Sequence, residues 1–152
     1  MTAAKRPPNA VRATWAGGYR FDTGRPGGPV APIDGDGETG QSPPDALLSA
    51  LAACSGIDVV DILAKRRTPV EKLTIDVAGE RREDIPRRFV HLTLTYNLEG
   101  AGVEAVHAER AVSLAFEKYC SVAASLAPDI VAETIVVVNG VRGTPVRQRI
   151  AG

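Results

Sequence analysis

Two cysteines are the residues of this chain whose type and setting point most directly to chemistry. Cys54 stands inside a long apolar run, and Cys120 follows a second helical pattern. Because a thiolate is a nucleophile, the pair predicts redox chemistry in which one sulfur attacks an oxidant and the other resolves the product. The alternative is a pair of inert buried cysteines, since free cysteine is among the most buried residue types.

The spacing of the two cysteines and the start of the chain narrow the choice of chemistry. Cys54 and Cys120 are too far apart for a local C-x-x-C motif. The first residues are basic, but no apolar stretch follows them, which argues against a secretory signal and predicts a cytoplasmic protein. In that reducing compartment, two thiols favour catalysis or sensing over a permanent disulfide.

Composition predicts one globular domain over residues 1–152 that binds neither nucleic acid nor membrane. Apolar residues make up 44% of the chain and charged residues 24%, which are ordinary globular values. The 18 basic and 18 acidic residues balance, so net charge favours no anionic partner. Asp58 and Asp61 interrupt the longest apolar run, so we expect no membrane-spanning helix.

The elements that must position the cysteines can be read from the pattern of residues. Residues 1–10 are expected to be a flexible tail, because Pro7 and Pro8 block regular structure. The segment 11–21 is typical of a strand that turns at Gly17 and Gly18, and a second strand is expected over 30–33. A glycine-rich loop follows over residues 34–41.

A long helix is predicted to carry Cys54, from Ser42 to about residue 66. Ser42 is a suitable N-cap, Pro43 fits the first helical position, and Asp45 completes a pattern like a capping box. Apolar residues lie nearly all round this helix, which is typical of a buried one. At roughly 36 Å it is longer than a small domain covers, so a partner subunit is expected to supply part of the cover.

The second half of the chain alternates strands and helices. Strands are predicted over 73–77 and 90–98, antiparallel if residues 84–86 form their turn. A helix is predicted over 103–119, followed by a shorter one that begins at Cys120 or Ser121, and a last strand over 134–139. The resulting fold class is α+β.

Two stretches together identify a family. Residues 40–63, which read GQSPPDALLSALAACSGIDVVDIL, resemble the first cysteine motif of the OsmC/Ohr family. Residues 117–122, which read EKYCSV, resemble its second motif in the form found in the YhfA-like branch. The order and spacing of the motifs also fit, and the similarity covers residues 11–139.

This resemblance implies a fold, an assembly and an activity. The expected fold is OsmC-like, with antiparallel sheets around a long buried central helix in an intertwined homodimer. Characterised members reduce organic hydroperoxides, so Cys54 would attack the peroxide and Cys120 would resolve the sulfenic acid to a disulfide. A dithiol reductant, in relatives a lipoylated protein or a small thiol, would restore both. The resemblance implies no metal and no bound cofactor.

Activation of Cys54 raises a physical question. The residue lies about three turns into its helix, too far for the helix dipole, and an ionised Asp58 one turn further on would raise the pKa of the thiol. We therefore expect a cation from elsewhere in the fold. By resemblance, Arg20 is the first candidate and Arg25 a weaker one, although an ordinary surface position fits Arg20 equally well.

The chain also departs from the hydroperoxide reductases. Pro44 stands where they carry a glutamate, and Asp45 one position later fits a helix cap better than a catalytic acid. The second motif lacks the proline that follows their cysteine. If Cys120 begins the short helix, the N-terminus of that helix and Lys118 would stabilise its thiolate. The alternative is a buried residue at a helix end beside Tyr119, which is expected to pack there.

Other chemistries find less support. His91 and His107 are too few and too scattered for a zinc site, and no spacing supports a Cys-His-Asp hydrolase. Two non-peroxidase alternatives stay open. One is a dimer that binds a small apolar ligand around Cys54, and the other is a redox sensor that uses the same disulfide without efficient turnover.

Overall fold

The computed structural model describes residues 3–150 and divides the chain into two compact units, one ending at Leu47 and one beginning at Leu48. Residues 3–11 are exposed and form neither helix nor strand, as the two prolines predict. The flexibility predicted for residues 1–10 stays a prediction, and residues 1–2 lie outside the described part.

The first unit is a three-stranded antiparallel sheet in the order β1-β2-β3. Its strands are β1 (Arg12–Trp15), β2 (Arg20–Gly24) and β3 (Ala31–Asp34). Gly17 and Gly18, both with positive φ, form the turn between β1 and β2, which confirms the predicted hairpin. The sheet carries apolar side chains without covering them, because Trp15 is 65% and Val30 65% exposed.

Helix α1 (Pro43–Lys65) carries Cys54 and has the predicted start. The Ser42 hydroxyl accepts a hydrogen bond of 3.3 Å from the backbone N–H of Asp45, so Ser42 caps the first turn. Arg67, with φ of 65°, reverses the chain directly after the helix. Both ends therefore agree with the sequence prediction.

The expectation that α1 is buried on all sides was wrong for the chain taken alone. Its buried residues lie along one side: Leu51, Ser55, Gly56, Val59 and Leu63. Other apolar positions are open, and Ile57 is 68% and Val60 43% exposed. By length and composition α1 could also cross a membrane, a property that core helices of soluble proteins share.

The second unit contains a larger sheet in the order β4-β5-β6-β7, with β8 also paired to β6. Its strands are β4 (Lys72–Arg81), β5 (Phe89–Glu99), β6 (Val131–Val138), β7 (Val141–Arg142) and β8 (Val146–Gln148). The antiparallel pairing of β4 with β5 confirms the prediction. The sheet is nevertheless mixed and not purely antiparallel, because β5 and β6 run parallel.

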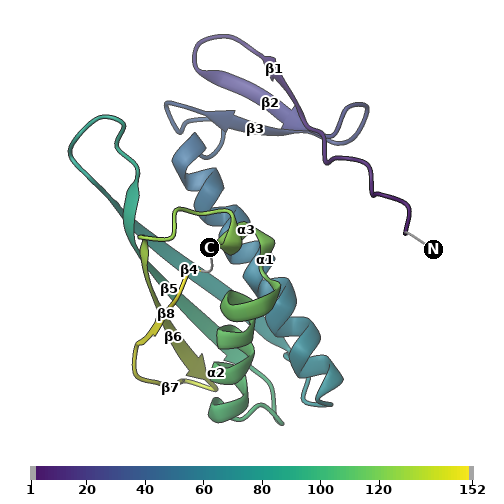
Figure 1. Cartoon of the computed structure of the whole chain (residues 1–152), viewed down its shortest axis with the longest axis vertical. Helices are drawn as coiled ribbons and strands as arrows, with labels where there is room; N and C mark the ends of the chain where they lie inside the picture. Colours follow the sequence, from purple (N-terminus) through teal and green to yellow (C-terminus); the bar gives the residue numbers. More distant parts are fainter. Residues whose placement is uncertain (1–2, 151–152) are drawn as a thin grey trace. The chain divides into compact units, whose positions relative to one another are not determined.

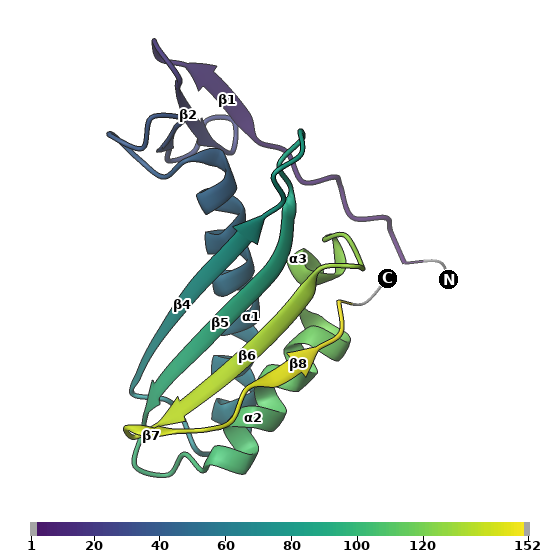
Figure 2. The same ribbon diagram turned by 90° about the vertical axis from the view of Figure 1, so that its left-hand side faces the viewer.

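Parallel neighbours require a crossover connection, and here the crossover is helical. It consists of α2 (Ala105–Leu114), the π-helical turn η1 (Ala115–Tyr119) and α3 (Ser121–Ala124). The helix predicted over 103–119 is thus an α-helix that widens into a π turn. Within this unit α1 and α2 lie on the same face of the sheet (Figures 1 and 2).

The core of the second unit lies between this sheet face and the two helices. Strand β5 supplies its centre, because Leu92, Leu94, Tyr96 and Leu98 alternate inward and are at most 1% exposed. The outward positions of β5 are polar, as expected for a sheet with one open face. Tyr96 is the polar exception on the inward face, and it lies beneath α1.

Candidate active site

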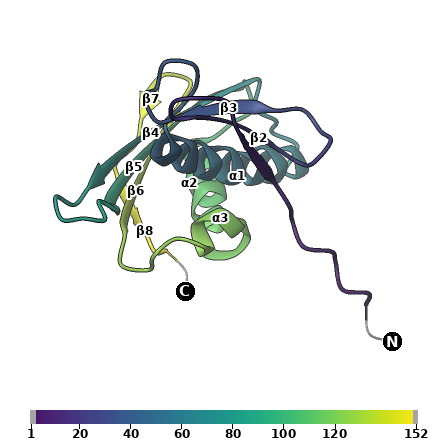
Figure 3. The same cartoon turned by 90° about the horizontal axis from the view of Figure 1, so that it is seen from above.

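The fold brings the two cysteines together. Cys54 lies near the middle of α1, and α3 runs beside that helix in Figures 1 and 3. The sulfur of Cys54 is 3.9 Å from the hydroxyl oxygen of Ser121, the first residue of α3. Cys120 directly precedes Ser121 in the chain, and each of the two thiols affects the pKa of the other. Both cysteines are free thiols.

The π turn η1 sets the position of Cys120. The backbone N–H of Cys120 donates to the carbonyl of Ala115, five residues earlier, at 2.7 Å. The backbone then becomes extended and Cys120 caps α3, with its sulfur accepting a 3.4 Å hydrogen bond from the N–H of Ala123. Single π turns are frequent at functional sites, because the extra residue redirects the side chain that follows.

The surroundings of Cys54 favour its ionised form. Partial burial works against the thiolate, but hydrogen bonds from the N–H of Val122, the thiol of Cys120, and the hydroxyl and N–H of Ser121 outweigh it. The pKa of Cys54 therefore lies below its usual value. The donors that lower this pKa lie at the start of α3, and the additional cation that the sequence analysis expects stays a prediction.

The pKa of Cys120 is shifted in the opposite direction, above its usual value. Burial is the main cause that raises the pKa of its thiol to about 11, and the neighbouring Cys54 raises it further. The N–H of Ala123 lowers this pKa by less. The alternative of a buried cysteine at a helix end is therefore the one confirmed, since burial outweighs the stabilisation of a thiolate by the short helix. Lys118 lies over the Tyr119 ring, 5.3 Å from its centroid.

A pair of hydroxyl groups that the sequence analysis missed lies beneath the thiols. The Ser55 hydroxyl and the phenol of Tyr96 are 2.7 Å apart, and Ser55 also donates to the carbonyl of Ala52. Burial is the main reason that the pKa of Tyr96 lies far above its usual value, so the phenol stays protonated. The sequence feature that could have revealed this pair is a single tyrosine at an inward position of an otherwise apolar strand.

The arginine candidates belong to the first unit. Arg20 lies on β2 and donates two hydrogen bonds, of 3.0 and 3.1 Å, to Asp22. Arg25 follows β2 and its carbonyl accepts from the N–H of Gly28. A role of either arginine toward Cys54 stays a prediction. Asp45 lies in the first turn of α1, where its charge complements the helix dipole.

The remaining candidates form surface contacts. His91 lies 3.6 Å from Glu133, and His107 contacts Arg66 at 2.5 Å. Tyr119, expected to pack, is 51% exposed. Within residues 3–150, no group of three or more histidine, cysteine or acidic side chains is placed to hold a metal ion.

Comparison with known proteins identifies the family. Residues 35–134 match the family model described as OsmC-like protein. The YhfA protein of Escherichia coli K12 is 39% identical over 117 residues, which cover 76% of this chain and 87% of that protein. The chain belongs to the OsmC-like protein family.

Two solved structures have a similar fold. A hypothetical protein from Aquifex aeolicus VF5 is 30% identical, with a TM-score of 0.79 over 88% of this chain and 98% of that one. The organic hydroperoxide resistance protein OhrB of Bacillus subtilis is 17% identical, with a TM-score of 0.55 over 86% of this chain and 96% of that one. The second likeness shows the shared OsmC-like fold alone.

The donors at Ser121 generate a first prediction. Ser121→Ala removes the hydroxyl, and Ser121→Pro also removes the backbone N–H while fitting the first helical position. Each lost donor destabilises the thiolate, so the pKa of Cys54 should rise by roughly half a unit in the first variant and about one unit in the second. The pH dependence of Cys54 alkylation by iodoacetamide measures the change.

Ser125→Ala is the matched control for this series. The Ser125 hydroxyl bonds the carbonyl of Ser121 at 2.7 Å, at the other end of α3. Its loss should leave the pKa of Cys54 unchanged. An unaltered pKa in Ser121→Pro would contradict the role given to these donors.

Proposed function

We propose that this OsmC-like protein reduces organic hydroperoxides with Cys54 as the attacking thiol and Cys120 as the resolving thiol. One observation carries the proposal: Cys54 lies against α3, 3.9 Å from the Ser121 hydroxyl that directly follows Cys120 in the chain. The pKa values of the two thiols agree with it, because that of Cys54 is lowered and that of Cys120 is raised to about 11. An attack-and-resolve mechanism needs this difference, since only one sulfur should meet the oxidant as a thiolate.

In the first step the Cys54 thiolate attacks the distal oxygen of the hydroperoxide. The S–O bond forms as the O–O bond breaks, so the sulfur is oxidised to a sulfenic acid and the peroxide is reduced to an alcohol. The alkoxide that leaves must take up one proton. Hydrogen bonds from Ser121 and Val122 hold the sulfur in place for this attack.

In the second step the Cys120 sulfur attacks the sulfenic sulfur of Cys54. An S–S bond forms, the S–OH bond breaks, and the departing oxygen leaves as water. Burial of Cys120 keeps it reduced until its partner has reacted, because a protonated thiol is a poor nucleophile. A dithiol reductant, such as a lipoylated protein, then returns both sulfurs to thiols.

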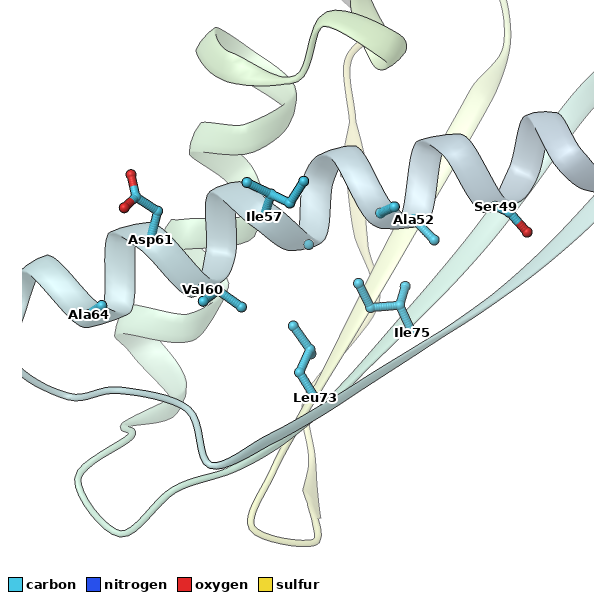
Figure 4. A pocket seen from close by; sticks show the side chains of 10 residues that line it. Ser49, Ala52, Ile57, Val60, Asp61, Ala64, Leu73 and Ile75 are labelled. Carbon is cyan, nitrogen blue, oxygen red and sulfur yellow. The ribbon is translucent and has the colours of Figure 1, made fainter. Parts of the chain in front are cut away.

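The ligand-binding alternative has less support. An apolar groove of about 720 Å³ lies between α1 and β4. Figure 4 shows Leu73 and Ile75 of β4 pointing toward this face of the helix. Cys54 is not among the residues that line it. A ligand in this groove would leave the opposite pKa shifts of the two thiols unexplained.

We also propose that the groove and the exposed face of α1 are covered by a second copy of the chain. Ile57 and Val60 expose apolar surface beside the groove, and β4 is an edge strand of its sheet. The uncovered apolar residues of the first unit also support an assembly, because such surface is usually buried against a partner. An OsmC-like homodimer would bury all three features.

The peroxidase proposal is tested by intact mass. The reduced protein receives one equivalent of cumene hydroperoxide, and the mass is read at intervals. The parent should lose about two mass units as the disulfide forms, and Cys120→Ser should gain about 16 units as the sulfenic acid accumulates. Cys54→Ser should not change quickly. Equal stability of all three masses would contradict the proposal.

The homodimer is tested by sedimentation equilibrium. Ile57→Glu places a charge on the exposed face of α1, and burial of an unpaired charge costs several kcal/mol. The dissociation constant should therefore rise more than tenfold. Ile85→Glu, at a position that is 91% exposed on the β4–β5 hairpin, is the control and should remain dimeric. A monomeric parent would refute the assembly.

A further inference from the structure

Two buried hydroxyl groups join α1 to the strand β5, and the mechanism above does not use them. The hydroxyl of Ser55 and the phenol of Tyr96 are 2.7 Å apart, and both residues are 0% exposed. Ser55 belongs to the buried row of α1, and its neighbours in that row are the apolar residues Leu51, Val59 and Leu63. Tyr96 likewise stands among the inward-facing leucines of β5. Each of the two apolar surfaces thus contributes one hydroxyl group, and these groups meet.

The direction of this hydrogen bond follows from the other contact of Ser55. The Ser55 hydroxyl donates its single proton to the carbonyl of Ala52 at 3.3 Å. Its oxygen is therefore the acceptor for the proton of Tyr96. Burial raises the pKa of Tyr96 far above its usual value, so the phenol keeps this proton. Both hydroxyl groups are satisfied, and the pair does not ionise in the pH range in which Cys54 does.

Apolar packing alone does not fix the place of α1 on the sheet. Leucines recur at alternate positions of β5, and aliphatic side chains recur about once a turn along the buried row of α1. The helix could therefore turn or slide and still bury them. A hydrogen bond is directional, and a displaced helix would leave the buried phenol without an acceptor, which is costly. The hydroxyl pair thus selects one placement of α1 on β5.

Cys54 directly precedes Ser55, so the same contact sets the direction of its side chain. One residue turns a helix by about 100°, which allows Ser55 to face the sheet while Cys54 faces α3. The sulfur of Cys54 lies 3.9 Å from the hydroxyl oxygen of Ser121 on α3. A rotation of α1 by about 20° would move a side-chain atom by about 2 Å, since such atoms lie roughly 5 Å from the axis. Hydrogen bonds do not survive a displacement of this size.

We propose that Ser55 and Tyr96 are positioning residues, whose hydrogen bond fixes α1 on the sheet so that the sulfur of Cys54 meets the donors at the start of α3. Neither residue is catalytic, because both act through Cys54. This inference rests on the proposed peroxidase function, since it names the residues that set the reactivity of the attacking thiol. Its consequence for the free thiol can also be measured without a peroxide.

The first measurement is stability. Ser55→Ala leaves the buried phenol without an acceptor, so the midpoint of thermal unfolding should fall by roughly 5 °C. Tyr96→Phe should cost less, because the Ser55 hydroxyl keeps its bond to the carbonyl of Ala52. The double variant leaves no hydroxyl unpaired. It should recover most of the loss, because replacing both partners of a buried hydrogen bond by apolar groups is nearly neutral.

The reactivity of the thiol should not recover with the stability. The pH dependence of alkylation by iodoacetamide, followed by mass in the peptide that contains Cys54, gives the pKa of this thiol. In the double variant this pKa should lie roughly half a unit above that of the parent. Below the pKa, the thiolate fraction is then about threefold smaller, and single-turnover oxidation by cumene hydroperoxide should slow by the same factor.

Thr134→Val is the matched control. The Thr134 hydroxyl accepts a 3.0 Å hydrogen bond from the buried side-chain amide of Gln148. This contact joins β6 to β8 and does not involve α1. Its loss should lower the midpoint of thermal unfolding and leave both the pKa of Cys54 and the rate of oxidation unchanged.

The outcomes separate this inference from the proposed function. A double variant that matches the parent in both midpoint and Cys54 pKa would show that the hydroxyl pair only fills the core, which overturns the inference. An equal rise of the Cys54 pKa in Thr134→Val would assign the effect to general loosening and overturn it as well. A parent that does not react with the hydroperoxide would refute the peroxidase, and the alkylation profiles would still decide the positioning role.

Discussion

The site depends on the hydrogen bonds that the first turn of α3 donates to the sulfur of Cys54. Cys54 lies too deep in α1 to benefit from the dipole of its own helix, and its partial burial disfavours charge. The N–H groups of Ser121 and Val122 compensate for the distant helix dipole and for the burial, and so lower the pKa of Cys54. They reach the sulfur because β5 and β6 are parallel, so the chain must cross over between them and does so beside α1.

The first turn of α3 lies beside both sulfurs, but the pKa values of the two thiols differ. Cys120 lies at the N-terminus of α3, where the N–H groups of Ala123 and Val122 lower the pKa of its thiol, yet burial dominates and raises this pKa to about 11. Cys54 approaches from another helix, is less buried and collects more donors. Different degrees of burial near a shared set of donors thus give the two thiols different pKa values, which is the difference that the proposed roles of attack and resolution require.

The sequence predicted the elements well and the site incompletely. The Ser42 cap, the Gly17-Gly18 turn and the alternation in β5 are local signals, so they could be read directly. The parallel pairing of β5 and β6 and the missed strands β7 and β8 depend on contacts between distant segments. The pKa values of the thiols depend on burial, which no spacing reveals. The exposed face of α1 indicates why the helix looked buried in the sequence: its apolar residues exceed what one chain covers.

The central claim is that the pKa of Cys54 is lowered and that of the neighbouring Cys120 is raised within one molecule. Nuclear magnetic resonance of protein labelled with ¹³Cβ-cysteine reports the ionisation of each sulfur separately, in the reduced parent and without a mutation. The account predicts that Cys54 titrates below its usual value and that Cys120 titrates near 11. Titration of Cys120 first, or of Cys54 at or above its usual value, would contradict the division of roles.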